Sequence, residues 1–152
     1  MGTINQLVAN LAFPQNKVAY AAMKELEALS QQSDQVYPYF DTFLSMLDDP
    51  NSYVRSRGII LLAQNARWDQ AGKLDWAIDT YLVHIMDEKP ITARQCIQSL
   101  KLILDAKPEL GVKIRTALEQ ADFSGYPDSM SPLLEKDRLA ILKQINKSSQ
   151  ER

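Results

Sequence analysis

Few residues in this chain of 152 could carry out nucleophilic chemistry. Its only cysteine, Cys96, and its only histidine, His84, form the one conceivable nucleophile–base pair. Cys96 falls in a column of small residues with Ala22 and Gly58, at positions where closely packed helices require a small side chain. His84 stands in a largely apolar segment. We therefore predict a core role for Cys96 and a partly buried, hydrogen-bonded His84, and we assign no catalytic residue.

Adjacent carboxylates form two clusters, Asp48-Asp49 and Asp87-Glu88. An acid/base pair of the glycosidase type needs a cleft and two separated environments, whereas both clusters fall at the end of a predicted helix and in its turn. We predict that they stabilise these turns. The sequence contains no Gly-rich phosphate loop, no paired histidines at metal spacing and no G-x-S-x-G turn. The expectation is a protein that is not an enzyme and has no metal and no cofactor.

Two tryptophans, Trp68 and Trp76, flank the connection from Gln64 to Lys73. We expect one of them to seal the core beneath this connection. The alternative is an aromatic platform for a ligand.

A group of arginine, lysine and glutamine residues gives the strongest indication of a binding site in the sequence. Arginine forks bind carboxylates and phosphates through two hydrogen bonds, and helix amino termini favour anions. We predict that these residues form a row on one surface, with a lysine at its rim: Arg57, Arg94, Lys89, Gln98, Lys101 and Gln64. In the alternative interpretation, the two arginines pair with the carboxylates of the turns.

These residues must be positioned by helices. The chain has nineteen leucines against six valines and only five glycines, a balance that favours helix. Apolar residues recur with helical spacing, and prolines stand where helices would begin. The predicted helices cover 3–12, 16–31, 35–48, 52–66, 73–86, 90–106, 108–120 and 131–147, with a loop over 122–130 and a disordered tail over 148–152. The fold class is therefore predicted to be all-α.

The helices repeat as pairs. Val18, Val54 and Thr92 are 36 and 38 residues apart, and they define columns in which small or apolar residues coincide. Four pairs of about 37 residues fill the chain, with the terminal pairs acting as caps. We predict one domain over 1–147, an α-α superhelix (right-handed solenoid) whose second helices line the concave side.

The segment from Asp49 to Arg55 resembles the inter-helix turn of a HEAT repeat. In that family an aspartate lies in the turn, and a valine and an arginine follow near the start of the second helix. Asp49, Val54 and Arg55 occupy these places. The resemblance implies that the aspartate accepts hydrogen bonds from backbone or arginine groups and keeps successive repeats in register. The third pair keeps only Asp87 of this pattern.

Two segments, 51–58 and 88–97, look like a narrower group of small bacterial HEAT-like proteins, which often carry a label taken from the SufB/SufD iron–sulfur assembly scaffold. That label implies an accessory role in cluster assembly. A cluster scaffold needs several thiolate, histidine or carboxylate ligands, and this chain offers one cysteine and one histidine.

Charge and composition narrow the partners. The net charge of −2 and a pI near 5.4 disfavour wrapping of duplex DNA. Some HEAT-like bacterial proteins nevertheless bind DNA and excise alkylated bases, so a nucleic-acid-binding or DNA-repair protein remains the alternative hypothesis. No stretch has the composition of a membrane span or a signal peptide, so we expect a cytoplasmic protein. The leading hypothesis is a non-enzymatic interaction or scaffold module that binds a peptide or an acidic protein segment on its concave face. The sequence does not determine the oligomeric state.

Overall fold

The computed structural model describes residues 3–151, and its regular elements are all helical over this range. The predicted all-α class is thereby confirmed. The helices are α1 (Ile4–Asn10), α2 (Asn16–Gln32), α3 (Phe40–Met46), α4 (Ser52–Asn65), α5 (Lys73–Leu82), α6 (Pro90–Ala106), α7 (Gly111–Gln120) and α8 (Ser131–Glu151).

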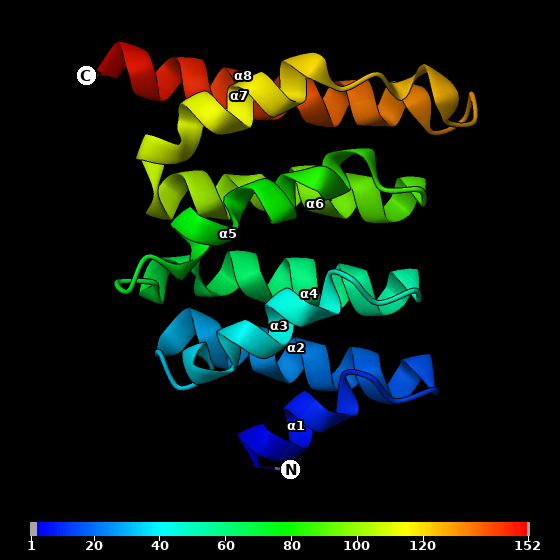
Figure 1. Ribbon diagram of the computed structural model, residues 1–152, viewed down its shortest axis with the longest axis vertical. Helices are drawn as coiled ribbons and strands as arrows, with labels where there is room; N and C mark the ends of the chain where they lie inside the picture. The colour runs from blue at the N-terminus through cyan, green and yellow to red at the C-terminus, as the bar shows by residue number, and fades with distance from the viewer. Residues whose placement is uncertain (1–2, 152) are drawn as a thin grey trace.

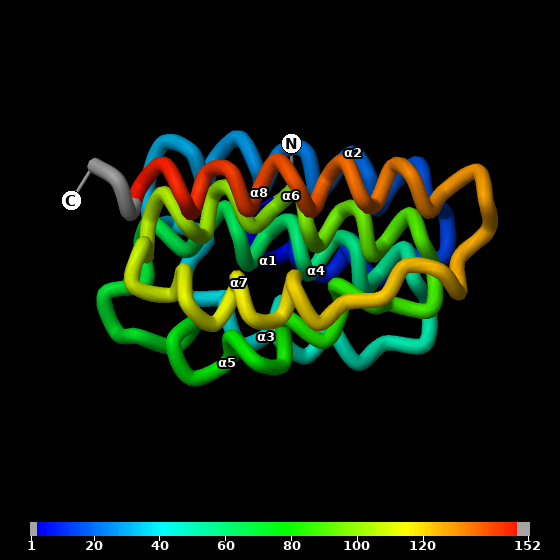
Figure 2. Tube along the Cα trace, turned by 90° about the horizontal axis from the view of Figure 1, so that it is seen from above, coloured from blue at the N-terminus to red at the C-terminus, as the bar shows by residue number. Residues whose placement is uncertain are grey.

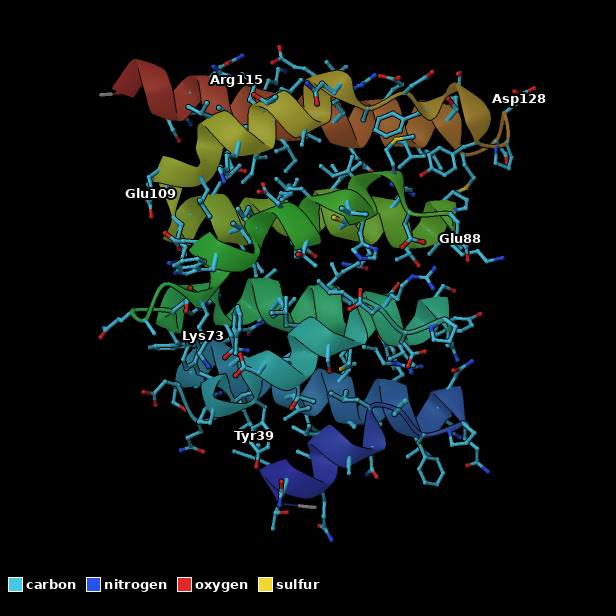
Figure 3. The ribbon with its side chains drawn as sticks, in the orientation of Figure 1. Tyr39, Lys73, Glu88, Glu109, Arg115 and Asp128 are labelled. Carbon is cyan, nitrogen blue, oxygen red and sulfur yellow. The ribbon has the colours of Figure 1, made fainter. Side chains whose placement is uncertain are left out.

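The helices form two layers (Figures 1 and 2). Helices α2, α4, α6 and α8 lie side by side in chain order and form what we call the inner layer, while α1, α3, α5 and α7 form the outer layer. The turns inside each pair all lie at one end, marked in Figure 3 by Glu88 and Asp128, and the links between pairs lie at the other, marked by Lys73 and Glu109. Superhelical curvature and its hand stay predictions.

Helix starts follow local chemistry. Thr3 caps α1 in a reciprocal capping box with Gln6, and the Asn51 side chain accepts a hydrogen bond from the Tyr53 N–H at the start of α4. Pro90 is the first residue of α6, where a missing N–H costs nothing. Pro38 stands in a 3₁₀ turn directly before α3, which satisfies its restricted backbone angle.

Several predicted helix boundaries differ from the structure. The outer helices are shorter than predicted, because 3₁₀ segments take up Tyr37–Tyr39, Val83–Met86 and Pro108–Leu110. At the carboxyl end, α8 continues to Glu151, so the predicted disordered tail is helical as far as this residue. No proline or glycine follows Pro132 to stop the helix. Arg152 lies outside the described residues.

One continuous cluster of buried side chains runs through the stack, from Leu7 in α1 to Ile145 in α8. Its centre is α4, where Gly58, Ile59, Leu61, Leu62 and Ala63 are all buried. This burial agrees with the apolar character of the segment on almost every side, as expected for a helix packed between neighbours. Over residues 3–151, no helix is both long enough and apolar enough to cross a membrane.

Gly58 permits a close contact between α3 and α4, the two helices of the second pair. A Cβ atom at this position would stand 2.8 Å from the Phe43 carbonyl oxygen and 2.9 Å from the Met46 Cβ, both in α3. Neither atom can move without shifting the helix, since one is backbone and the other is fixed to it. The column of small residues found in the sequence therefore has a direct steric cause at Gly58.

We predict that Gly58→Ala lowers the free energy of unfolding by about 1–3 kcal/mol, because the added methyl group forces α3 and α4 apart. Urea unfolding followed by circular dichroism measures this change. Gly125→Ala is the matched control, since a Cβ there meets nothing within 4 Å. Equal stability of the two variants would show that the α3–α4 contact yields without cost.

Candidate functional site

Arg57 is buried and its guanidinium is used inside the protein. From α4, Nη1 donates to the Leu11 carbonyl oxygen at 3.0 Å and Nη2 donates to Asn16 Oδ1 at 3.0 Å. Burial lowers the pKa of Arg57. The side chain thus fastens the second helix pair to the turn between α1 and α2, and its polar groups satisfy backbone that would otherwise be unpaired.

Arg94 reaches in the opposite direction along the stack. Its Nε donates to Asp137 Oδ2 of α8 at 2.7 Å, and Nη2 donates to Oδ1 of the same carboxylate at 3.3 Å. This hydrogen bonding raises the pKa of Arg94. Arg57 and Arg94 therefore hold different neighbours and do not form the predicted row across one surface. Nor does either pair with the carboxylates of the turns, as the alternative interpretation proposed.

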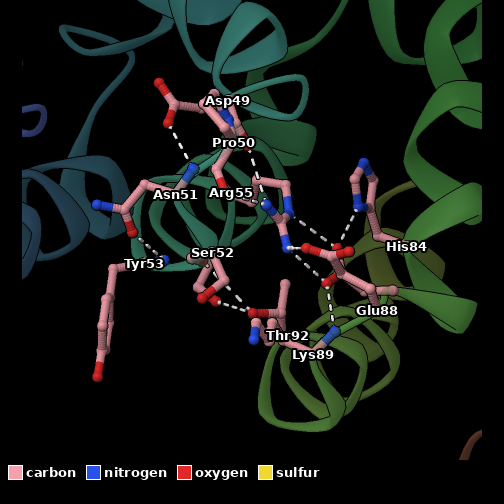
Figure 4. A network of polar contacts seen from close by, with 12 residues as sticks. Asp49, Pro50, Asn51, Ser52, Tyr53, Arg55, His84, Glu88, Lys89 and Thr92 are labelled. Atoms are coloured by element: carbon pink, nitrogen blue, oxygen red, sulfur yellow. Dashed lines mark hydrogen bonds and ion pairs between the residues drawn. The ribbon is translucent and has the colours of Figure 1, made fainter.

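Arg55 is the arginine that meets those carboxylates (Figure 4). Its Nε donates to Asp87 Oδ2 at 3.0 Å and its Nη2 to Asp87 Oδ1 at 2.8 Å, a two-point pairing of α4 with the turn before α6. Nη1 donates to the carbonyl oxygens of Asp49 and Pro50 at 3.0 and 3.1 Å. The arginine side chain is 8% exposed and the Asp87 side chain 3% exposed, so the pair is shielded from water.

Asp87 accepts further hydrogen bonds that organise the turn. The Lys89 N–H donates to its Oδ1 at 2.9 Å, and His84 Nδ1 lies 2.8 Å from its Oδ2. Burial alone would raise the pKa of Asp87, but hydrogen bonds from Arg55, the Lys89 N–H and His84 outweigh it and lower the pKa. The predicted turn-stabilising role of Asp87 is confirmed, and Asp49 acts similarly by accepting from the Asn51 N–H at 2.8 Å.

A second buried carboxylate, Asp69, stands in the link between α4 and α5. It accepts hydrogen bonds from the Tyr37 hydroxyl and from the N–H groups of Lys73 and Leu74, and Lys107 Nζ lies 3.2 Å from its Oδ2. Burial alone would raise the pKa of Asp69, but these donors outweigh it and lower the pKa. Asp69 therefore joins the second and third pairs at the end opposite Asp87.

Of the remaining predicted binding residues, one is buried and three are exposed. Gln64 is buried and donates to Glu27 Oε2 at 3.1 Å, which ties α4 to α2. Gln98 is exposed on α6, although its Nε2 donates to Asp137 Oδ1 at 3.3 Å. Lys89 and Lys101 are exposed, the first in the turn before α6 and the second on α6 itself. Binding at Lys89, Gln98 and Lys101 stays a prediction.

The predicted structural roles of Cys96 and His84 are confirmed. Cys96 is fully buried, and its Sγ donates to the Tyr81 carbonyl oxygen at 3.6 Å. Burial, followed by the nearby charge of Asp87, raises the pKa of the thiol, so the thiolate needed for nucleophilic attack is disfavoured. His84 is buried and directed to Asp87 rather than to the cysteine.

The two tryptophans have different environments. Trp68 is half-buried, and its Nε1 donates to the Ser30 carbonyl oxygen at 2.7 Å, which ties the link after α4 to α2. That it seals the core there stays a prediction. Trp76 is 91% exposed on α5 in the outer layer.

A surface hollow between the starts of α4 and α6 was not found by sequence reasoning. We call it the α4–α6 hollow; it is lined by Ser52, Tyr53, Ser56, Lys89, Ile91 and Thr92. Tyr53 and Ile91 are both the second residue of their helix and are 60% and 73% exposed. The sequence contained a signal for this hollow, because Tyr53 and Ile91 directly precede the aligned residues Val54 and Thr92 and are both large and apolar.

Positive charge is concentrated in the inner layer, whereas α1, α3, α5 and α7 together hold three Lys and Arg residues and four Asp and Glu residues. Helices α2, α4, α6 and α8 hold ten of the 17 Lys and Arg residues but only six of the 19 Asp and Glu residues. The exposed surface of this layer, which we call the inner face, also carries two half-buried apolar residues at its middle. It includes Lys24, Ile60, Gln98, Lys101, Leu102 and Lys136.

No family model, no curated protein and no solved structure matches this chain. Within residues 3–151, no group of three or more His, Cys, Asp or Glu residues is placed to hold a metal ion.

We predict that Asp87→Ala lowers the free energy of unfolding by about 3–5 kcal/mol, because it leaves the buried Arg55 charge without its partner. The measurement is urea unfolding at neutral pH. Glu88→Ala is the control, because Glu88 is 75% exposed and only 3.8 Å from the same guanidinium; a surface pair of this kind contributes about 0–1 kcal/mol. A loss at Asp87 no larger than that at Glu88 would mean that water solvates Arg55.

We predict that stability falls as the pH drops below about 4, because Asp69 and Asp87 have pKa values below the ordinary 3.8. In this range the unfolded chain binds more protons than the folded one, so the free energy of unfolding decreases with falling pH. Urea unfolding at a series of pH values should show a shallower decrease for Asp87→Asn. Gly58→Ala is the control, because it should lower the free energy of unfolding equally at every pH. If the pH dependence of Asp87→Asn equals that of the wild type, the Asp87 carboxylate is not the source of the pH dependence.

Proposed function

We propose that this protein is a cytoplasmic, non-enzymatic interaction module, a right-handed solenoid of four HEAT-like helix pairs whose inner face binds an acidic segment of a partner protein. The observation that carries the proposal is the combination of basic and apolar side chains on the inner face. The stacked pairs, with Arg55 of one pair bound to Asp87 of the next, support the HEAT-like part.

The charges of the inner face favour an acidic partner. Lys101 and Lys136 are exposed on the neighbouring helices α6 and α8, and neither side chain forms a salt bridge with the residues that the structure describes. Lys24, on α2, is bound to Glu27 at 2.9 Å, which leaves its other donors free. Complementary charge of this kind steers association and selects partners more than it raises affinity.

Apolar contact supplies the rest of the affinity for the proposed partner. Ile60 on α4 and Leu102 on α6 are half-buried residues on adjacent helices, and both pack against the core at their base. Covering their exposed parts removes apolar surface from water, at roughly 25 cal/mol per Å². A segment that alternates carboxylates with apolar side chains therefore suits this face better than a purely acidic one.

The candidate binding residues are revised accordingly. Lys89, Gln98 and Lys101 stay as candidates because they are exposed. Arg57, Arg94 and Gln64 serve instead to position α4, α6 and their neighbours, so their replacement would disturb the fold together with any binding.

We predict that a random phage-displayed peptide library, selected on the immobilised protein, yields peptides with net negative charge and apolar residues. The double variant Lys101→Glu with Lys136→Glu should bind these peptides about tenfold more weakly, since two exposed ion pairs each contribute at most about 1 kcal/mol. Fluorescence polarisation with a selected peptide measures the change.

Lys113→Glu is the matched control, because Lys113 is an exposed lysine of the outer layer. Its peptide affinity should equal that of the wild type. Selection of basic peptides, or equal weakening by the control, would overturn the proposal. Tight binding of a short DNA duplex with no peptide selected would do the same and would favour the nucleic-acid alternative.

A further inference from the structure

The α4–α6 hollow lies at the edge of the inner face, where the second and third pairs meet. Two exposed apolar side chains bound it, Tyr53 from α4 and Ile91 from α6. Exposed residues of this size are ordinary when single, but here the same position of two successive pairs carries one. Together they form the two walls of one recess.

The base of the hollow is polar and already satisfied. Ser56 Oγ and Thr92 Oγ1 lie 2.9 Å apart across the two helices, and the Thr92 hydroxyl is 3.4 Å from the Ser52 carbonyl oxygen. Because the base has these internal partners, a ligand does not have to satisfy them. The walls stand on the first turns of two long helices, one of them capped by Asn51, so the recess exists before any partner arrives.

Charge at the hollow has one sign. Lys89 is its only charged lining residue, and no carboxylate lines it. The backbone of Lys89 is fixed because its N–H donates to Asp87 Oδ1 at 2.9 Å. The positive end of the α6 dipole lies on the same side and adds to this field. Figure 4 shows how Ser52, Thr92 and Lys89 come together beside the Arg55 network.

We propose that the α4–α6 hollow is the anchor for the acidic segment: one apolar side chain of the segment inserts between Tyr53 and Ile91, and a neighbouring carboxylate pairs with Lys89. This inference rests on the proposed function and names the element of the partner that gives it specificity. A few inserted anchor side chains carry most of the binding energy in many interfaces, and charges beside them set orientation.

The test uses the full chain and short fluorescein-labelled peptides in which aspartates flank a single leucine. A second peptide has serine in place of the leucine, and a third has lysines in place of the aspartates. Fluorescence polarisation gives the affinities, and amide chemical-shift changes in the ¹⁵N-labelled protein locate the contact. We expect binding of the first peptide, about tenfold weaker binding of the other two, and the largest shifts at Ile91 and Thr92.

Ile91→Ser and Lys89→Glu should each weaken binding of the leucine peptide by about tenfold. The matched controls are Val112→Ser, an equally exposed aliphatic residue of α7, and Lys113→Glu. All four residues are exposed, so the variants should keep the wild-type circular dichroism spectrum and unfolding midpoint.

Three outcomes would overturn the anchor, and the first and third of them leave the proposed function standing. If Lys101→Glu with Lys136→Glu weakens peptide binding but Ile91→Ser does not, the inner face binds the segment and the hollow plays no part. If the serine peptide binds as well as the leucine peptide, no apolar side chain is inserted. If the leucine peptide does not bind while selected peptides still bind the inner face, the anchor is wrong and the proposed function stands.

Discussion

The buried ion pair between Arg55 and Asp87 is the interaction on which the middle of the stack depends. Taking both charges out of water is costly unless each finds partners for its remaining donors and acceptors. Here the guanidinium also donates to two carbonyl oxygens, and the carboxylate also accepts from a backbone N–H. The pair therefore fixes three things together: the end of the outer helix, the turn, and the start of the next inner helix.

Three arginines hold three successive junctions, although they do so in different ways. Arg57 binds the first pair through a carbonyl oxygen and an amide, Arg55 binds the third pair through a buried carboxylate, and Arg94 binds the fourth through Asp137. Because these side chains are occupied within the protein, the proposed recognition falls to residues that the junctions leave exposed. Those residues are the lysines of the inner face and the walls of the α4–α6 hollow.

Helical periodicity and proline placement predicted the helices well, because both act through local backbone chemistry that needs no knowledge of neighbours. The direction of each arginine could not be predicted in the same way. Arg55 and Arg57 are two residues apart, so they project about 200° apart around α4, and only the packed neighbours decide which side meets a carboxylate. Tyr53 and Ile91 escaped attention for a related reason: apolar residues in a helix are first assigned to the core, and their exposure becomes visible only when the adjacent helix is in place.

The layered order of the helices has a consequence for how the molecule comes apart. Each pair packs mainly on the pair before it and the pair after it, so cooperativity should be transmitted between nearest neighbours rather than through one central nucleus. Within residues 3–151, the first and fourth pairs each pack on a single neighbouring pair and should open before the rest, whereas α4 and α6 are enclosed on both sides. Opening of the first and fourth pairs would therefore leave the two central pairs assembled, and with them the α4–α6 hollow that these pairs share.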